Sequence, residues 1–173
     1  MKLKPVTKVI GAGVIVMLAL FAWHNIASGE ALWQQELKLL HMRLAEAIRA
    51  KDVDKIMTCY ENSEHLIVFD VVPPRQYTGW NAYKTDWQGV LGQCKDSPVW
   101  DESDLHFFGG KTWAYSHSIV HFACSNGDNT KLDLILRVTD GYANFGGKWL
   151  ISHEHISVPV DLATGKADLQ SKP

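Results

Sequence analysis

Apolar residues recur with helical spacing in the first half of the chain, so helices are expected there. The first helix runs for about five turns, because apolar positions return every three or four residues. Its apolar stripe consists of Trp33, Leu37, Leu40, Leu44 and Ile48. Asp52 can cap a second, short helix that extends through Tyr60. Gly79 opens a third helix, whose shared face carries Trp80, Tyr83, Trp87 and Leu91.

The second half of the chain has the alternating pattern of β-strands. An earlier β-rich run, from His65 to Val72, ends at Pro73-Pro74, and consecutive prolines cannot continue a β ladder. We therefore expect a strand that ends near Asp70. From Val99 onward the period is two, and three turn signals separate four segments of strand length. The turn signals are Gly109-Gly110, Asn126-Gly127-Asp128 and Gly146-Gly147.

This order of elements indicates an α+β domain. A meander of four long antiparallel strands joins one earlier strand, after about three helices. We expect a cone-shaped barrel, in which a strongly curved, mixed or antiparallel sheet wraps over the N-terminal helices. Both faces of the four strands carry polar side chains, so the alternation alone does not tell which face meets solvent.

The start of the chain has the order of a signal peptide. Lysines precede an unbroken apolar run from Val9 to Trp23, and the small residues Ala27 and Gly29 follow it. The run of about fifteen residues is shorter than the ~20 of a membrane span. We predict a signal peptide over 1–29 and a periplasmic or secreted protein. Without cleavage, Val9 to Trp23 would instead anchor the protein to the membrane.

The remaining sequence is predicted to form one domain over 30–160 and a polar C-terminal tail over 161–173. Removal of the leader takes away three of the 17 basic residues and none of the 19 acidic ones, which leaves a formal charge of −5. This charge argues against a nucleic-acid partner. The three cysteines, Cys59, Cys94 and Cys124, lie far apart without a CxxC motif, so at most one disulfide can form. Alternatively, all three are small buried hydrophobic residues.

Several short motifs point to a known family. They are Phe69-Asp70, Pro73-Pro74, Gly79, Arg137-Val138-Thr139, Gly147-Lys148-Trp149 and the run from His153 to Pro159. Their spacing resembles the SnoaL-like branch of the nuclear transport factor two and ketosteroid isomerase superfamily, over Leu32 to about Asp161. The resemblance implies a mostly apolar pocket, no cofactor, and a homodimer formed through the outer face of the sheet. It does not select a reaction, because this fold hosts many.

The first functional hypothesis is a binding module for one small anionic or aromatic metabolite. Arg137, with His153 or His155, would be its polar anchor, because a guanidinium group binds a carboxylate through two parallel hydrogen bonds. Alternatively, Arg137 pairs with an internal acid such as Asp70 or Glu102. The aromatic lining would come from Trp80, Tyr83, Trp87 and Trp113, which are also ordinary core residues.

The second hypothesis is a cofactor-independent enzyme of the isomerase, dehydratase or cyclase type. Asp70 would be its base and Tyr115 or His117 its proton donor, since burial near tryptophans raises the pKa of a carboxyl group. The simpler interpretation is that Asp70 only shapes the turn before the prolines. As a third possibility, the domain serves only as a dimerisation or assembly unit.

Four histidines suggest a metal site as a rival interpretation. They are His117, His121, His153 and His155, and imidazole binds transition-metal ions readily. However, same-face spacing is common in histidine-containing sheets, and the helical H-E-x-x-H motif is absent. We predict no metal and no cofactor. The expected partners are a small-molecule ligand and a second copy of the chain, with the membrane involved only if the leader is retained.

Overall fold

The computed structural model describes residues 31–128 and 130–171. The predicted signal peptide over 1–29 lies outside these residues. By its internal contacts the chain divides after Gln35, and the fold described below is that of the unit that begins at Glu36. Within the described ranges, no helix is both long enough and apolar enough to cross a membrane.

Three helices form where the sequence predicts them. They are α2 (Leu32–Arg49), α3 (Val53–Met57) and α4 (Trp80–Gln93). The apolar stripe of α2 is confirmed, because Leu37, Leu40, Leu44 and Ile48 are all buried. The Asp52 side chain caps α3 by accepting a 3.1 Å hydrogen bond from the amide of Lys55. This helix ends at Met57, three residues earlier than expected.

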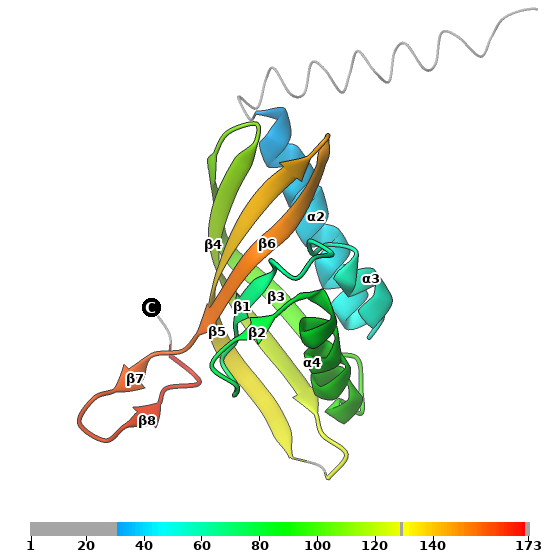
Figure 1. The fold of residues 1–173 in the computed structure, drawn as a ribbon. Helices are drawn as coiled ribbons and strands as arrows, with labels where there is room; N and C mark the ends of the chain where they lie inside the picture. Colours follow the sequence, from blue (N-terminus) through cyan, green and yellow to red (C-terminus); the bar gives the residue numbers. More distant parts are fainter. Residues whose placement is uncertain (1–30, 129, 172–173) are drawn as a thin grey trace, which may run out of the picture. The chain divides into compact units, whose positions relative to one another are not determined.

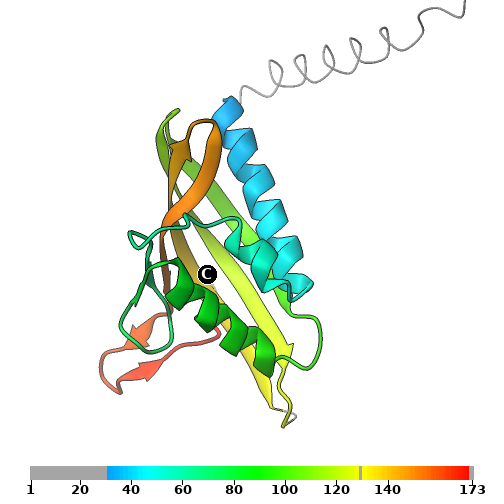
Figure 2. The same ribbon diagram turned by 45° about the vertical axis from the view of Figure 1, so that its right-hand side comes forward.

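A six-stranded sheet carries the rest of the fold. Its strands are β1 (Ile67–Phe69), β2 (Tyr77–Thr78), β3 (Val99–Gly109), β4 (Trp113–Ser125), β5 (Lys131–Phe145) and β6 (Lys148–Ser157). They lie in the order β2-β1-β6-β5-β4-β3, with β1 parallel to β6 and every other pair antiparallel. The sheet is strongly curved, and the helices lie on one face of it (Figures 1 and 2). The predicted α+β class with a mixed sheet is confirmed.

The two faces of the sheet differ in burial. In β4 every even-numbered residue from Ala114 to Cys124 is buried beneath the helices, and the odd-numbered ones turn to the outer face. In β6 this alternation shifts by one residue. Tyr142 pairs with Ile151 but Gly141 pairs with His153, so Ser152 is an extra residue in a β-bulge. Beyond the bulge the even-numbered residues of β6 turn inward.

The bulge corrects the face that the sequence predicts for the end of β6. Strict alternation places Trp149, Ile151, His153 and His155 on one face of the strand. It places Glu154 on the other face. In the structure Trp149, Ile151 and Glu154 are all buried, and His155 is exposed. A single inserted residue therefore brings a carboxyl group into the core and turns the two histidines away from it.

Two further features were not predicted. The expected polar tail contains a short hairpin, β7 (Val160–Asp161) and β8 (Lys166–Ala167), and its residues are exposed. A disulfide joins Cys94, directly after α4, to Cys124 in β4, with their Cα atoms 5.5 Å apart. Cys59 is a buried free thiol.

Candidate functional site

Helix α4, the sheet and the segment after β1 enclose an apolar cavity of about 90 Å³, which we call the Asp70 cavity. Most of its wall is aromatic or aliphatic and includes Trp87, Trp100, Phe122, Leu134, Leu136 and Ile156. Three polar side chains also line it, those of Asp70, Tyr83 and Asp86. An apolar cavity with a few polar groups is the usual form of a small-molecule site.

The carboxyl groups of Asp70 and Asp86 line the same cavity, and their charges interact. Burial and the neighbouring charge of Asp86 raise the pKa of Asp70 to about 6. Burial also raises the pKa of Asp86, but this carboxylate accepts a 2.6 Å hydrogen bond from the Tyr77 hydroxyl, which stabilises its charge. Of the two carboxyl groups, Asp70 is therefore the more readily protonated as the pH falls.

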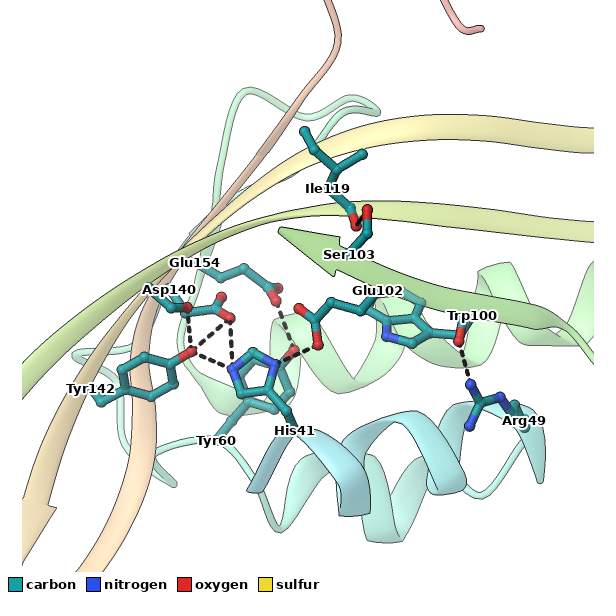
Figure 3. Close-up of polar contacts among 11 residues, drawn as sticks. His41, Arg49, Tyr60, Trp100, Glu102, Ser103, Ile119, Asp140, Tyr142 and Glu154 are labelled. Atoms are coloured by element: carbon teal, nitrogen blue, oxygen red, sulfur yellow. Dashed lines mark hydrogen bonds and ion pairs between the residues drawn. The ribbon is translucent and has the colours of Figure 1, made fainter. Parts of the chain in front are cut away.

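A second group of acids lies deeper in the core. We call Glu102, Asp140 and Glu154 the buried carboxyl cluster; Asp140 is 2% exposed and Glu154 is 1% exposed. Two tyrosine hydroxyls donate hydrogen bonds to Glu154, that of Tyr60 to Oε1 at 3.0 Å and that of Tyr83 to Oε2. Figure 3 shows the side chains of Tyr60, Glu102, Asp140 and Glu154 pointing toward one another.

The carboxyl groups of Asp140 and Glu154 also interact through their charges. Burial raises the pKa of Glu154 to about 7, and burial together with the charge of Glu154 holds the pKa of Asp140 well above its ordinary value. Two carboxylates in contact cannot both ionise cheaply without water. The pair therefore holds one proton at neutral pH.

His41 of α2 connects Glu102 to this pair. Its Nδ1 lies 2.9 Å from Glu102 Oε2, and its Nε2 lies 2.5 Å from the hydroxyl oxygen of Tyr142 (Figure 3). The Tyr142 hydroxyl in turn lies 3.1 Å from Asp140 Oδ2. Burial alone would raise the pKa of Glu102, but the hydrogen bond and charge of His41 bring it below its ordinary value. A chain of polar contacts thus runs from Glu102 through His41 and Tyr142 to Asp140.

The structure brings together three of the sequence-predicted site residues. Asp70, Tyr83 and Trp87 line the same cavity. Trp80 is half-buried on the same helix, but it packs outside this cavity, and its indole N–H donates a 3.0 Å hydrogen bond to the Met57 carbonyl. Of the aromatic residues predicted on this helix, Tyr83 and Trp87 therefore line the pocket and Trp80 does not.

The other predicted residues lie on the outer face of the sheet, because they occupy the positions that alternate with the buried ones. They are Trp113, Tyr115, His117, Arg137, His153 and His155. The sheet separates them from the Asp70 cavity, so the expected pairing of Asp70 with Tyr115 or His117 does not form. Glu102 has His41 as its partner, not Arg137. Among the described residues, no group of three or more His, Cys, Asp or Glu side chains is arranged to hold a metal ion.

Sequence reasoning missed the polar centre of the core. Its members are His41, Glu102, Asp140, Tyr142 and Glu154. A signal existed for three of them. His41 lies on the apolar stripe of its helix, and Asp140 and Tyr142 continue the face that carries Leu134, Leu136 and Val138. A charged residue that continues an apolar face is a candidate for a buried, paired group.

Comparison with solved structures defines the class of the fold. A nuclear transport factor 2-like protein of unknown function from Pseudomonas putida is 30% identical, with a TM-score of 0.71 over 80% of this chain and 95% of that one. A nuclear transport factor 2-like superfamily protein from Salmonella enterica is 17% identical, with a TM-score of 0.66 over 78% and 96%. A proposed scytalone dehydratase from Novosphingobium aromaticivorans is 15% identical, with a TM-score of 0.65 over 82% and 95%. The fold is thus nuclear transport factor 2-like.

Within this class the family is also defined. The model of the SnoaL-like domain matches residues 38–161, so the chain belongs to the SnoaL-like family, as its motifs indicated. No curated protein matches the sequence. The family assignment supports a domain that bears a pocket, and the chemistry has to be argued from this chain's own residues.

Proposed function

We propose that the domain binds one small, uncharged, largely apolar or aromatic molecule in the Asp70 cavity and exchanges a proton with it through Asp70. The observation that carries this proposal is the position of Asp70: a carboxyl group with a pKa of about 6 lines a largely apolar wall. A general acid or base works best when its pKa lies near the working pH. The corresponding activity is a cofactor-independent isomerase, dehydratase or cyclase reaction.

The charges around the cavity favour a neutral ligand over an anionic one. Its charged or titratable wall groups are Asp70, Asp86 and Tyr83, none of which offers a positive charge. Arg137, which suggested an anionic metabolite, lies on the opposite face of the sheet. A carboxylate ligand in this cavity would be repelled by Asp86 and would lose its hydration without gaining a cation.

The size of the cavity limits the ligand further. At about 90 Å³ it is smaller than the roughly 150 Å³ engineered cavity that holds benzene. A ring-sized ligand therefore enters only if a lining side chain shifts. Val72, which is 41% exposed, is the lining residue least held by packing.

A pair of probes of matched size but different charge tests the proposal. Phenol and benzoate are titrated into the protein near neutral pH, and backbone NMR shifts are followed at Val71 and Trp87, which line the cavity. Phenol should shift these signals and benzoate should not. In D70N, where one negative charge is removed at nearly constant shape, benzoate should begin to shift them.

The matched control is D101N, because Asp101 is 70% exposed on β3 and is absent from the cavity wall. It should leave both titrations unchanged. Two results would contradict the proposal. One is benzoate binding with shifts centred on Arg137 and His153, which would support the anionic site on the outer face. The other is no shift at Val71 or Trp87 with either probe.

We also propose that the protein is exported and that its leader is cleaved. In addition to the N-terminal pattern of the sequence, the Cys94–Cys124 disulfide supports this location, since disulfides persist in oxidising compartments. The intact mass of the protein purified from the periplasm or medium should correspond to a chain that begins at Glu30. Recovery of the full-length chain in the membrane fraction would favour the retained anchor.

Two copies are proposed to pair through the outer face of the sheet. Large aromatic side chains are exposed there, with Phe108 44%, Trp113 62% and Tyr115 43% exposed, and the rings of Phe108 and Tyr115 stack at 5.2 Å. Exposed apolar groups that lie together mark interaction surfaces. Light scattering should give the mass of a dimer, and Y115E should give a folded monomer. A monomeric wild-type protein would contradict this pairing.

A further inference from the structure

The chain of polar contacts in the core has one end at the protein surface. Glu102 is 14% exposed and, with His41, forms part of the wall of an open groove between α2 and β3. At its inner end the chain reaches Asp140, whose carboxyl group interacts with that of Glu154. The groove is therefore linked by side chains to the buried acids of the core.

Tyr142 is the critical link, because its hydroxyl has one proton and faces a possible proton donor and acceptor on each side. In one arrangement His41 is doubly protonated, its Nε2–H donates to the Tyr142 oxygen, and the Tyr142 O–H donates to the Asp140 carboxylate. In the other, Asp140 is protonated and donates to Tyr142, whose O–H donates to neutral His41. Both arrangements fit the contacts of 2.5 and 3.1 Å. They differ by the transfer of one proton from His41 to Asp140.

We propose that this chain is a proton path from the surface groove to the buried acids Asp140 and Glu154. A proton received by Glu102 passes to His41, and from His41 through the Tyr142 hydroxyl to Asp140, whose carboxyl group interacts with that of Glu154. Glu102, His41 and Tyr142 each give up one proton for each that they receive, and the buried acids keep it. Any use of the path in turnover rests on the proposed function, whereas its existence does not.

Few other polar groups surround the path. The titratable groups that face His41 are Glu102, Asp140 and Tyr142. The Tyr142 hydroxyl also lies 2.6 Å from the Ser116 hydroxyl, which does not titrate. Those that act on Glu154 are Tyr60, Tyr83, Asp140 and, more distantly, Asp70. Asp140 Oδ1 is buried and has no direct hydrogen-bond partner, so this carboxyl group has a free acceptor position. Such a group can take up a proton without first breaking a hydrogen bond.

A rapid drop in pH, followed by time-resolved infrared spectroscopy of protonated carboxyl groups, tests the path without any substrate. The band of the Asp140–Glu154 pair is identified by its change in E154Q. In Y142F, which removes only the bridging hydroxyl, protonation of the pair should slow by roughly a hundredfold, a typical contribution of one positioned proton-transfer group. E102Q, at the surface end, should slow it as well.

The matched control is Y60F. It removes the same hydroxyl group from another buried tyrosine, and Tyr60 donates to Glu154 without being part of the path. Protonation in Y60F should remain within a fewfold of the wild-type rate. If Y142F and E102Q protonate the pair as fast as Y60F does, the path is overturned. If Y142F does not fold, the protonation rate of the pair in E102Q is compared with the rate in E46Q, a variant of an exposed residue of the same groove. Equal rates in these two variants would also overturn the path. Failure of phenol to bind would remove the proposed function and leave this measurement unaffected.

Discussion

The hydroxyl group of Tyr83 donates a hydrogen bond to the buried carboxylate of Glu154, and the same tyrosine lines the Asp70 cavity. One side chain thus joins the apolar site to the acids of the core. The two sites have a common arrangement, because each contains two interacting carboxyl groups and at least one tyrosine hydroxyl that donates to one of them. Tyr77 donates to Asp86, and Tyr60 and Tyr83 donate to Glu154.

The buried pair makes stability depend on pH in an unusual direction. Unfolded Glu154 loses its proton near its ordinary pKa of 4.5, whereas the folded protein keeps it up to about 7. The stabilisation is complete below pH 4.5 and is lost as the pH rises through this window, by about 3 kcal/mol at most. Asp70 acts in the same direction. Urea unfolding at several pH values measures the effect.

In E154Q, whose amide resembles the protonated carboxyl group, the loss of stability towards alkaline pH should be much smaller. The exposed variant E46Q should keep the wild-type slope. An unchanged slope in E154Q would mean that Glu154 does not hold its proton in the folded state.

Loss of the Tyr83 hydroxyl should affect both stability and titration. Y83F keeps the ring but removes a hydrogen bond to a buried carboxyl group, which costs about 1–3 kcal/mol. It should also raise the pKa of Glu154 further, because this hydrogen bond lowers it. Chemical denaturation and carboxyl NMR measure the two effects. Y115F, on the exposed outer face, should change stability by less than about 0.5 kcal/mol.

Reduction of the disulfide should weaken the attachment of α4 to the sheet. The Cys94–Cys124 bond spans a sequence separation of 30, and closing a loop of this length contributes about 3–4 kcal/mol in the chain-entropy account. The melting temperature should therefore drop in reducing buffer, and the C94A/C124A variant should reproduce the drop. Cys59 should stay unreactive to thiol reagents in the folded protein, because burial raises its pKa. Equal melting temperatures with and without reductant would contradict this prediction.

Two adjacent glycines at the β3–β4 turn should respond differently to substitution. Gly109 has a φ of +140°, and a Cβ atom there would lie 2.5 Å from the backbone of Ala114. G109A should therefore destabilise the domain by about 1–3 kcal/mol. Gly110 has open space around it, so G110A should be nearly neutral. Similar unfolding free energies for the two variants would show that the turn adapts to a side chain.

The elements of this fold could be predicted from sequence, because apolar spacing and turn residues define each helix and strand locally. The site could be predicted only in part. Asp70, Tyr83 and Trp87 lie near clear signals, namely the proline pair and the apolar face of a helix. Glu154 could not be placed, since the bulge at Ser152 arises from pairing between β5 and β6 and inverts the faces beyond it. The alternation of residues within a single strand does not reveal such a shift.

The most direct test of the account is an NMR titration of the Asp70 side-chain carboxyl carbon, assigned with D70N and repeated with saturating phenol. We predict a midpoint of about 6 in the free protein and a higher midpoint with phenol bound, because the ligand displaces water from the carboxyl group. A midpoint near the ordinary 3.8, unchanged by phenol, would mean that Asp70 is a solvated turn residue and that this cavity is not the site.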